Sequence, residues 1–170
     1  MPGMKHTFVT EGAVAGGGSQ SLEWKRHSLA HLLAAAIMKM YPDAKRTIGP
    51  AIDDGFYFDF DFPTEKPSEK DFPKIEKEMR KLLPAWKGFE RHELSAAEAK
   101  KEYPGNPFKH ELIDEFTKGG EKVSFYKSGD YWDLCRGGMS RIPQRTSRRI
   151  RGSSTVSVAP IGEATRRIHS

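Results

Sequence analysis

His27 and His31 lie four residues apart in a segment predicted to be helical. Side chains at this spacing project from one face of an α-helix, about one turn apart. Two structural histidines, satisfied by backbone groups or by water, are the simplest interpretation. The surrounding segment is apolar, however, and burying an imidazole ring is unfavourable unless the ring finds partners. We therefore expect both rings to line a pocket, where histidines with a pKa near neutral can order or deprotonate a water molecule.

Cys135 is the only cysteine of the chain and ends a predicted strand in the segment D-L-C-R-G-G. A buried structural thiol and a site residue are both compatible with this position. A single cysteine excludes an internal disulfide framework, and residues 1–20 lack the apolar core of a secretion signal. The longest apolar stretch, 32–38, is too short to span a bilayer. We therefore expect a reducing, cytoplasmic setting and no membrane partner.

The two histidines belong to a predicted helix that Ser21 caps and that runs to about Tyr41. From Leu29 to Met38 this helix is apolar on nearly all sides, which is typical of a buried helix. A hairpin is predicted next, with strands 45–52 and 56–62. Its alternating phenylalanines form one face that belongs to the core: Phe56, Phe58, Phe60 and Phe62.

The rest of the pattern alternates helices with strands. Helices are predicted from Ser68 to Pro84, after the capping box at Ser95 and over 107–116, and strands near 88–94, 121–127 and 131–135. This order predicts an α+β fold in which a central buried helix packs against an antiparallel sheet. We expect a flexible lead over 1–20, one domain over 21–138 and a tail over 139–170.

Several strings in this domain are highly specific: R-H-S-L-A-H-L-L, Y-P-D-A-K, I-G-P, D-G-F-Y-F-D-F and S-G-D-Y-W-D-L-C-R-G-G. Together they closely resemble the editing domain of bacterial threonyl-tRNA synthetases, and the resemblance covers about residues 22–138. A related domain occurs in alanyl-tRNA synthetase and in free-standing editing proteins. In this family an H-x-x-x-H pair and a C-x-x-x-H pair form the editing site. His27, His31 and Cys135 match three of these positions, and Met139 occupies the fourth.

The resemblance implies further properties. Lys109 and Asp133 match two more positions that the family uses around the site. The implied activity is water-mediated hydrolysis of seryl-tRNA(Thr), with the acceptor end of tRNA(Thr) as partner. His27, His31 and Cys135 could also hold zinc with water as the fourth ligand, although the threonyl branch does not require it. ATP binding and dimerisation belong to the parent enzyme's other domains, which no segment of this chain resembles.

The net charge of +5 comes from the end of the chain, because residues 140–170 hold seven arginines, no lysine and one acid. After Gly138 the family pattern stops. Met139 to Gln144 can be encoded ATG-TCG-AGA-ATC-CCG-CAG. If a C precedes these bases and translation starts at that C, the same bases encode H-V-E-N-P-A. Pro160 to His169 yields the family motif Y-W-R-G-D in the same shifted frame. We therefore interpret the tail as an out-of-frame segment with little to bury, and expect it to be disordered.

Loss of the fourth site residue predicts a weak or inactive editing site. Two alternatives stay open. A free-standing trans-editing deacylase would need a polar residue where Met139 stands. A noncatalytic RNA-binding module would use the arginine-rich tail, whose contacts with RNA phosphates would weaken with salt.

Overall fold

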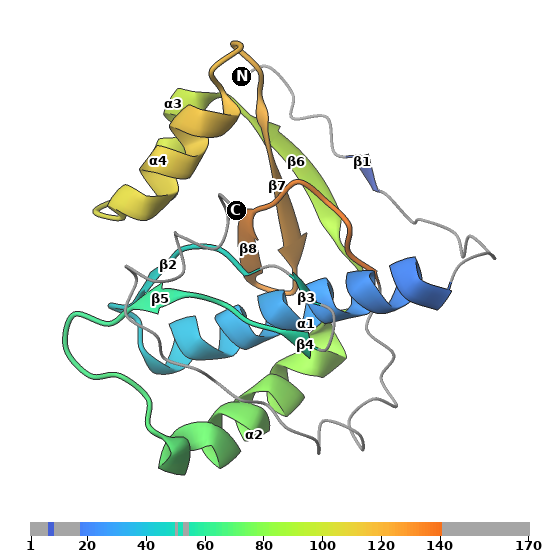
Figure 1. The fold of residues 1–170 in the computed structure, drawn as a ribbon, viewed down its shortest axis with the longest axis vertical. Helices are drawn as coiled ribbons and strands as arrows, with labels where there is room; N and C mark the ends of the chain where they lie inside the picture. Colours follow the sequence, from blue (N-terminus) through green and yellow to red (C-terminus); the bar gives the residue numbers. More distant parts are fainter. Residues whose placement is uncertain (1–6, 9–17, 50, 53–54, 141–170) are drawn as a thin grey trace.

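The computed structural model describes residues 7–8, 18–49, 51–52 and 55–140 (Figure 1). Helix α1 (Gly18–Met40) crosses the lower half of the molecule. It begins three residues before Ser21, so the prediction that Ser21 caps it is wrong. Ala30, Leu32 and Ala36 on this helix are fully buried, which confirms the buried central helix. A helix without a polar face can bury almost every side that it presents. None of the described helices is long and apolar enough to cross a bilayer.

The expected hairpin is present but is divided into two short antiparallel ladders. Strand β2 (Lys45–Arg46) pairs with β5 (Phe60–Asp61), and β3 (Ala51–Ile52) pairs with β4 (Gly55–Phe56). Between the ladders, the backbones of Thr47 and Ile48 bond to Asp59. The four phenylalanines predicted to share a face all pack against the core cluster around α1, which confirms the prediction.

Gly49 lies in this hairpin, where the ring of Phe58 packs directly against it. A Cβ atom added at residue 49 would lie 2.2 Å from Cδ2 of Phe58. We expect Gly49→Ala to displace this ring and to lower the free energy of unfolding by roughly 1–3 kcal/mol, the range for overpacking. Urea denaturation measures the change. Gly55→Ala is the matched control, because a Cβ there meets nothing within 4 Å. Equal effects of the two substitutions would contradict the steric explanation.

Helix α2 (Phe72–Leu82) covers α1 from below and contributes Ile75 and Met79 to the same core cluster. Two 3-10 turns flank it: η1 (Glu69–Asp71) and η2 (Leu83–Ala85). Ser68 and Asp71 form a capping box before η1, so the helical segment begins where the sequence predicts.

The other half of the molecule is a four-stranded antiparallel sheet in the order β1-β6-β7-β8. Its strands are β1 (Thr7–Phe8), β6 (Glu90–Leu94), β7 (Val123–Ser128) and β8 (Tyr131–Leu134). Helices α3 (Ala96–Lys101) and α4 (Pro107–Phe116) contact each other and complete a second core cluster with these strands. The predicted capping box at Ser95 and Glu98 is present.

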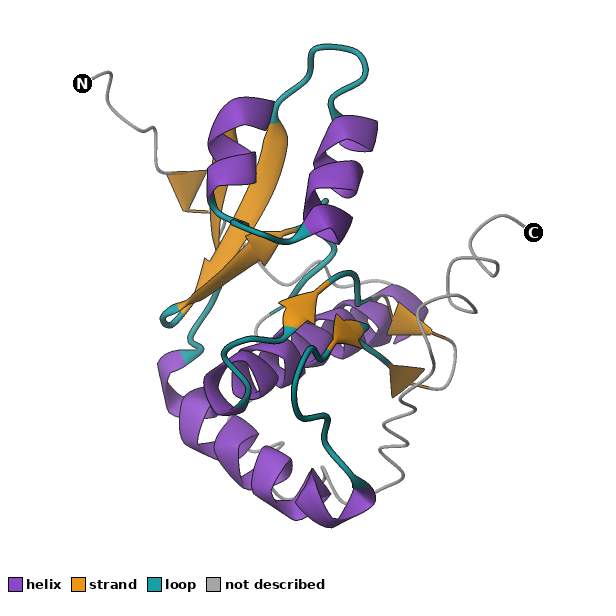
Figure 2. Ribbon diagram, turned by 90° about the vertical axis from the view of Figure 1, so that its left-hand side faces the viewer, coloured by secondary structure: helices purple, strands orange, loops and turns teal. Residues whose placement is uncertain are grey.

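The two halves lie one above the other, with the sheet and its helices over α1 and α2 (Figure 2). Mixed helices and antiparallel strands confirm the α+β prediction. Within the expected lead, Thr7 and Phe8 pair with Arg91 and Glu90. From the expected tail, Met139 is buried and the amide of Ser140 bonds to Ser28 on α1. The expectation of disorder over 141–170 concerns residues outside the described ones.

Candidate active site

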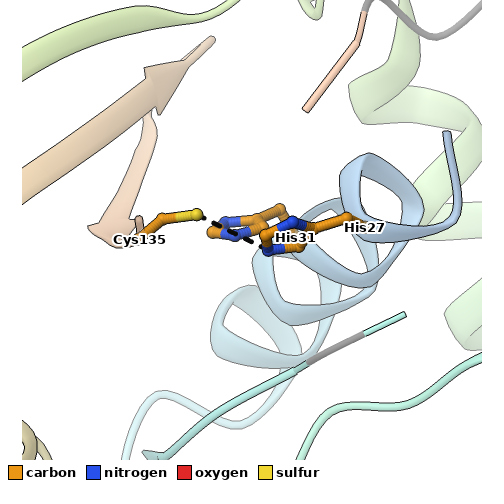
Figure 3. A group of neighbouring side chains, drawn as sticks. All are labelled: His27, His31 and Cys135. Atoms are coloured by element: carbon orange, nitrogen blue, oxygen red, sulfur yellow. Dashed lines mark hydrogen bonds between the residues drawn. The ribbon is translucent and has the colours of Figure 1, made fainter. Parts of the chain in front are cut away.

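His27, His31 and Cys135 converge where the end of the sheet meets α1 (Figure 3). Both imidazoles project from one face of α1, with ring centroids 5.0 Å apart. Cys135 is the residue directly after β8, and its sulfur lies 3.5 Å from Nε2 of His27. One ligand atom from each residue falls within 4.8 Å of the others. The predicted meeting of two helical histidines with the lone thiol is therefore present in the fold.

His31 is the most enclosed of the three side chains. Its exposed fraction is 3%, and Nδ1 is buried without a hydrogen-bond partner among the described residues. Aromatic rings surround it edge-on: Phe58, Phe89 and Tyr131, with centroids 6.2–6.5 Å away. The expected pKa near neutral is wrong for His31, because burial lowers its pKa to about 3 and the ring is neutral at pH 7. A buried imidazole nitrogen is thus left able to bond a water molecule or a ligand.

His27 and Cys135 form a neutral pair. The carbonyl of Gly138 lies 3.2 Å from Nδ1 of His27, and when Nδ1 carries the proton, Nε2 presents a lone pair to the thiol. Burial lowers the pKa of His27 and raises the pKa of Cys135 to about 12. The amide of Gly137 donates to the sulfur at 3.3 Å. Cys135 is therefore a protonated thiol at neutral pH, which is a poor nucleophile.

Lys109 and Asp133 form a buried ion pair next to this group. Lys109 Nζ lies 2.9 Å from Oδ1 of Asp133, and both side chains are at most 2% exposed. Lys109 is in the first turn of α4, where the Asn106 side chain accepts a hydrogen bond from the backbone amide of Lys109. Asp133 is on β8, two residues before Cys135. Both ions interact electrostatically with His31 and with Cys135. The structure therefore brings all five predicted site residues into one region.

Sequence reasoning missed three residues that complete this region. Tyr103 and Tyr131 both donate their hydroxyls to Asp133, the latter at 2.8 Å. Arg46 forms a second ion pair with Asp133, at 3.8 Å from Nε to Oδ1. Tyr131 could have been found, because alternate residues of a strand share a face and Tyr131 precedes Asp133 by two. For Arg46 and Tyr103 the local sequence carries no comparable signal.

Met139 occupies the fourth position of the expected site and is 7% exposed. A thioether neither donates nor accepts a proton at neutral pH and is a weak ligand for zinc. The two glycines before it, Gly137 and Gly138, have φ values of 111° and 74°. These values lie in the left-handed region that favours glycine. The turn that they form directs the chain from Cys135 back to α1.

The three converging residues also fit the chemistry of a zinc site. Imidazole and thiolate are the ligands that zinc prefers, and a catalytic zinc site has three protein ligands and one open position. The unpartnered Nδ1 of His31 and the spread of at most 4.8 Å are compatible with such a site.

The chain matches no family model. Threonine–tRNA ligase of Desulfatibacillum aliphaticivorans is 53% identical over 118 residues, which make up 69% of this chain and 18% of that protein. For the threonine–tRNA ligase of Rubrobacter xylanophilus the identity is 48% over 112 residues, 66% of this chain and 17% of that protein. For that of Thermotoga petrophila it is 45% over 117 residues, 68% and 18% respectively. The chain therefore spans less than one fifth of the length of the curated relatives that it matches.

Proposed function

Because this chain contains a domain of the threonyl-tRNA synthetase family, we propose that its site hydrolyses the ester of seryl-tRNA(Thr). The supporting observation is the meeting of two neutral imidazoles with a neutral thiol beside a buried ion pair. The partner is the acceptor end of tRNA(Thr), in the reducing cytoplasm that keeps Cys135 free.

A hydrolytic site meets a specific need in this family. Serine lacks one methyl group of threonine, and a missing methyl group changes binding by only about 1–3 kcal/mol. One selection step therefore leaves mischarged tRNA, which a second site must clear. An aminoacyl ester is already reactive, so a positioned water and donors for the developing oxyanion supply much of the rate.

We infer a water-mediated route from the protonation states of the site. A histidine accepts a proton as water oxygen attacks the ester carbonyl carbon, and the carbonyl electron pair moves onto oxygen. The tetrahedral intermediate then collapses, the ribose oxygen leaves and takes up a proton, and serine and free tRNA result. Cys135 is protonated and buried, so it serves as a hydrogen-bond partner of His27 rather than as the attacking group. The ammonium of Lys109 lies beside the site as a source of positive potential.

The same reasoning favours an impaired site. Met139 stands where the family pattern has a histidine, and it cannot hold or relay a proton. We propose that this chain hydrolyses seryl-tRNA(Thr) slowly, and that a one-base deletion within the codons for Gly137 and Gly138 caused the loss.

A deacylation assay with protein in excess over seryl-tRNA(Thr) tests the proposed activity. We expect slow hydrolysis above the spontaneous rate, and we expect His31→Ala to abolish the excess because its imidazole is the most enclosed one. His110→Ala is the matched control, because His110 bonds to the Lys100 carbonyl on the outer helices. A wild-type rate equal to spontaneous hydrolysis, or an undiminished rate in His31→Ala, would overturn the proposal.

A metal-assisted version of this site has its own test. We propose that His27, His31 and Cys135 can bind zinc, whose role would be to activate the attacking water. Titration with Co²⁺, a spectroscopic substitute for Zn²⁺, is expected to give a thiolate-to-metal absorption band. Cys135→Ser should remove the band, and His110→Ala should leave it unchanged. If wild-type protein gives no such band, the residues act without a metal.

The arginine-rich tail supports one competing function, a noncatalytic RNA-binding module. It predicts that tRNA affinity depends on the seven tail arginines and falls steeply with salt. A chain ending at Gly138 that retains full tRNA affinity would exclude this function. A free-standing trans-editing deacylase is disfavoured by Met139.

A further inference from the structure

Arg46 is a second buried cation of the site that the proposed reaction does not use. Its side chain is 14% exposed, and its Nε lies 3.8 Å from Oδ1 of Asp133. The same carboxylate oxygen pairs with Lys109 at 2.9 Å. In the described part of the chain, Asp133 is the carboxylate with which both cations form ion pairs. Burying two cations against one anion is unfavourable, because one positive charge is left without a counter-charge.

The guanidinium of Arg46 packs over two aromatic rings. Its Cζ is 5.1 Å from the ring centroid of Tyr103 and 4.9 Å from that of Tyr131. These are the two tyrosines whose hydroxyls donate to Asp133. A cation over an aromatic face is attracted by the electrons of the ring, and a guanidinium or an ammonium group can make this contact. Arg46 therefore fixes the rings that hold the carboxylate.

The backbone of Arg46 links this arrangement to Lys109. Nδ2 of Asn106 donates a hydrogen bond to the carbonyl oxygen of Arg46 at 2.8 Å. Oδ1 of Asn106 accepts a hydrogen bond from the backbone amide of Lys109. One side chain thus connects β2 to the first turn of α4. Displacement of Arg46 would consequently be transmitted both to the acid and to the lysine of the buried pair.

The charges of this network do not cancel. Arg46 and Lys109 contribute two positive charges and Asp133 one negative charge. One positive charge is left over in a site where water cannot screen it fully. Such a charge stabilises an anion more than it stabilises a neutral ester.

We propose that Arg46 is a positioning residue that orients Tyr103 and Tyr131 on Asp133 and leaves the network one positive charge for the oxyanion of ester hydrolysis. This inference rests on the proposed hydrolytic function. The substrate carbonyl is neutral and becomes negative only during attack. Arg46 therefore favours the transition state over the bound substrate, which is the condition for faster chemistry.

Binding of two non-hydrolysable ligands tests this role without requiring turnover. The first is adenosine bearing 3′-amide-linked serine, which has a neutral carbonyl. The second is the corresponding phosphonate, which has a tetrahedral anionic centre in the same place. Calorimetry on the full chain compares wild type with Arg46→Met, Arg46→Lys and the control Lys45→Met, which removes the neighbouring cation of β2. Thermal unfolding checks that each variant is folded.

We expect Arg46→Met to weaken phosphonate binding about tenfold, as loss of one charge several ångströms away would do, and to change amide binding less than twofold. Arg46→Lys should retain most of the preference for the phosphonate, and Lys45→Met should change neither ligand. If Arg46→Met weakens the binding of both ligands equally, or leaves phosphonate binding unchanged, the proposed role of Arg46 is wrong. The proposed hydrolytic function would not be affected by either result. If wild type binds neither ligand, the proposed function fails together with this inference. If Arg46→Met does not fold, Arg46→Lys decides, since a lost phosphonate preference despite retained charge contradicts the proposal.

Discussion

Asp133→Asn is expected to lower the free energy of unfolding by roughly 3–5 kcal/mol, the range for breaking a buried ion pair by removing one partner. Asparagine keeps the shape of the side chain but leaves Lys109 and Arg46 buried without a counter-charge. Asp133 is fully buried and accepts from both tyrosine hydroxyls, so solvent cannot replace the lost interactions. Few single substitutions elsewhere in this chain should have an effect of this size.

Chemical denaturation at pH 7 measures this change. Asp130→Asn is the control, because Asp130 is exposed in the turn between β7 and β8. Replacing all three charges, as in Arg46→Met and Lys109→Met with Asp133→Leu, should recover much of the loss, because no buried charge of this network is then left without a partner. A loss below 1 kcal/mol in Asp133→Asn would show that water reaches the pair.

The pH dependence of stability follows from the same residues. Burial alone would raise the pKa of Asp133, but Lys109 and Arg46 outweigh it and hold that pKa below its ordinary value of 3.8. Stability from Asp133 is therefore present above pH 3.8 and lost as the pH falls further. Burial lowers the pKa of His31 from 6.5 to about 3, so stability also decreases as the pH falls from 6.5 toward 3. Asp133→Asn should lose the part of this pH dependence that lies below pH 3.8 and keep the part that comes from His31.

Restoring the family reading frame after Gly138 is expected to raise the deacylation rate on the order of a hundredfold or more, the contribution typical of a positioned general acid–base group. The in-frame chain would place a histidine at position 139, four residues after Cys135. It would also continue past β8, which lies at an edge of the described sheet. Met139→His by itself should restore little, because the strands that would hold the new ring are still missing.

The measurement compares single-turnover hydrolysis of seryl-tRNA(Thr) by this chain, by Met139→His and by the frame-restored protein. Adding His31→Ala to the frame-restored protein should return the rate to that of this chain or below. Equal rates for this chain and the frame-restored protein would overturn the proposed damage. Sequencing the encoding DNA tests the cause directly, since an uninterrupted frame without a recoverable synthetase downstream contradicts a deletion.

Much of the fold could be predicted because its signals are local. The all-round apolar run of α1, the alternating phenylalanines of the hairpin and the capping box at Ser95 each depend on residues within a few positions. The structure confirms all three. The start of α1 was wrong by three residues because a serine suited to capping also fits inside a first turn, and only tertiary contacts choose between the two.

The sequence by itself determined the α+β class, the burial of α1 and, through motif resemblance, the candidate residues His27, His31, Lys109, Asp133 and Cys135. Their catalytic roles stay predictions. Only the tertiary structure decided that the Cys135 sulfur lies 3.5 Å from Nε2 of His27, and that the guanidinium of Arg46 packs over the rings of Tyr103 and Tyr131. The physical reason is that a buried charge is stable only beside partners, and these partners come from β2, β8 and the segment before α4. Periodicity records which face of an element is buried, but not which distant side chain it will meet.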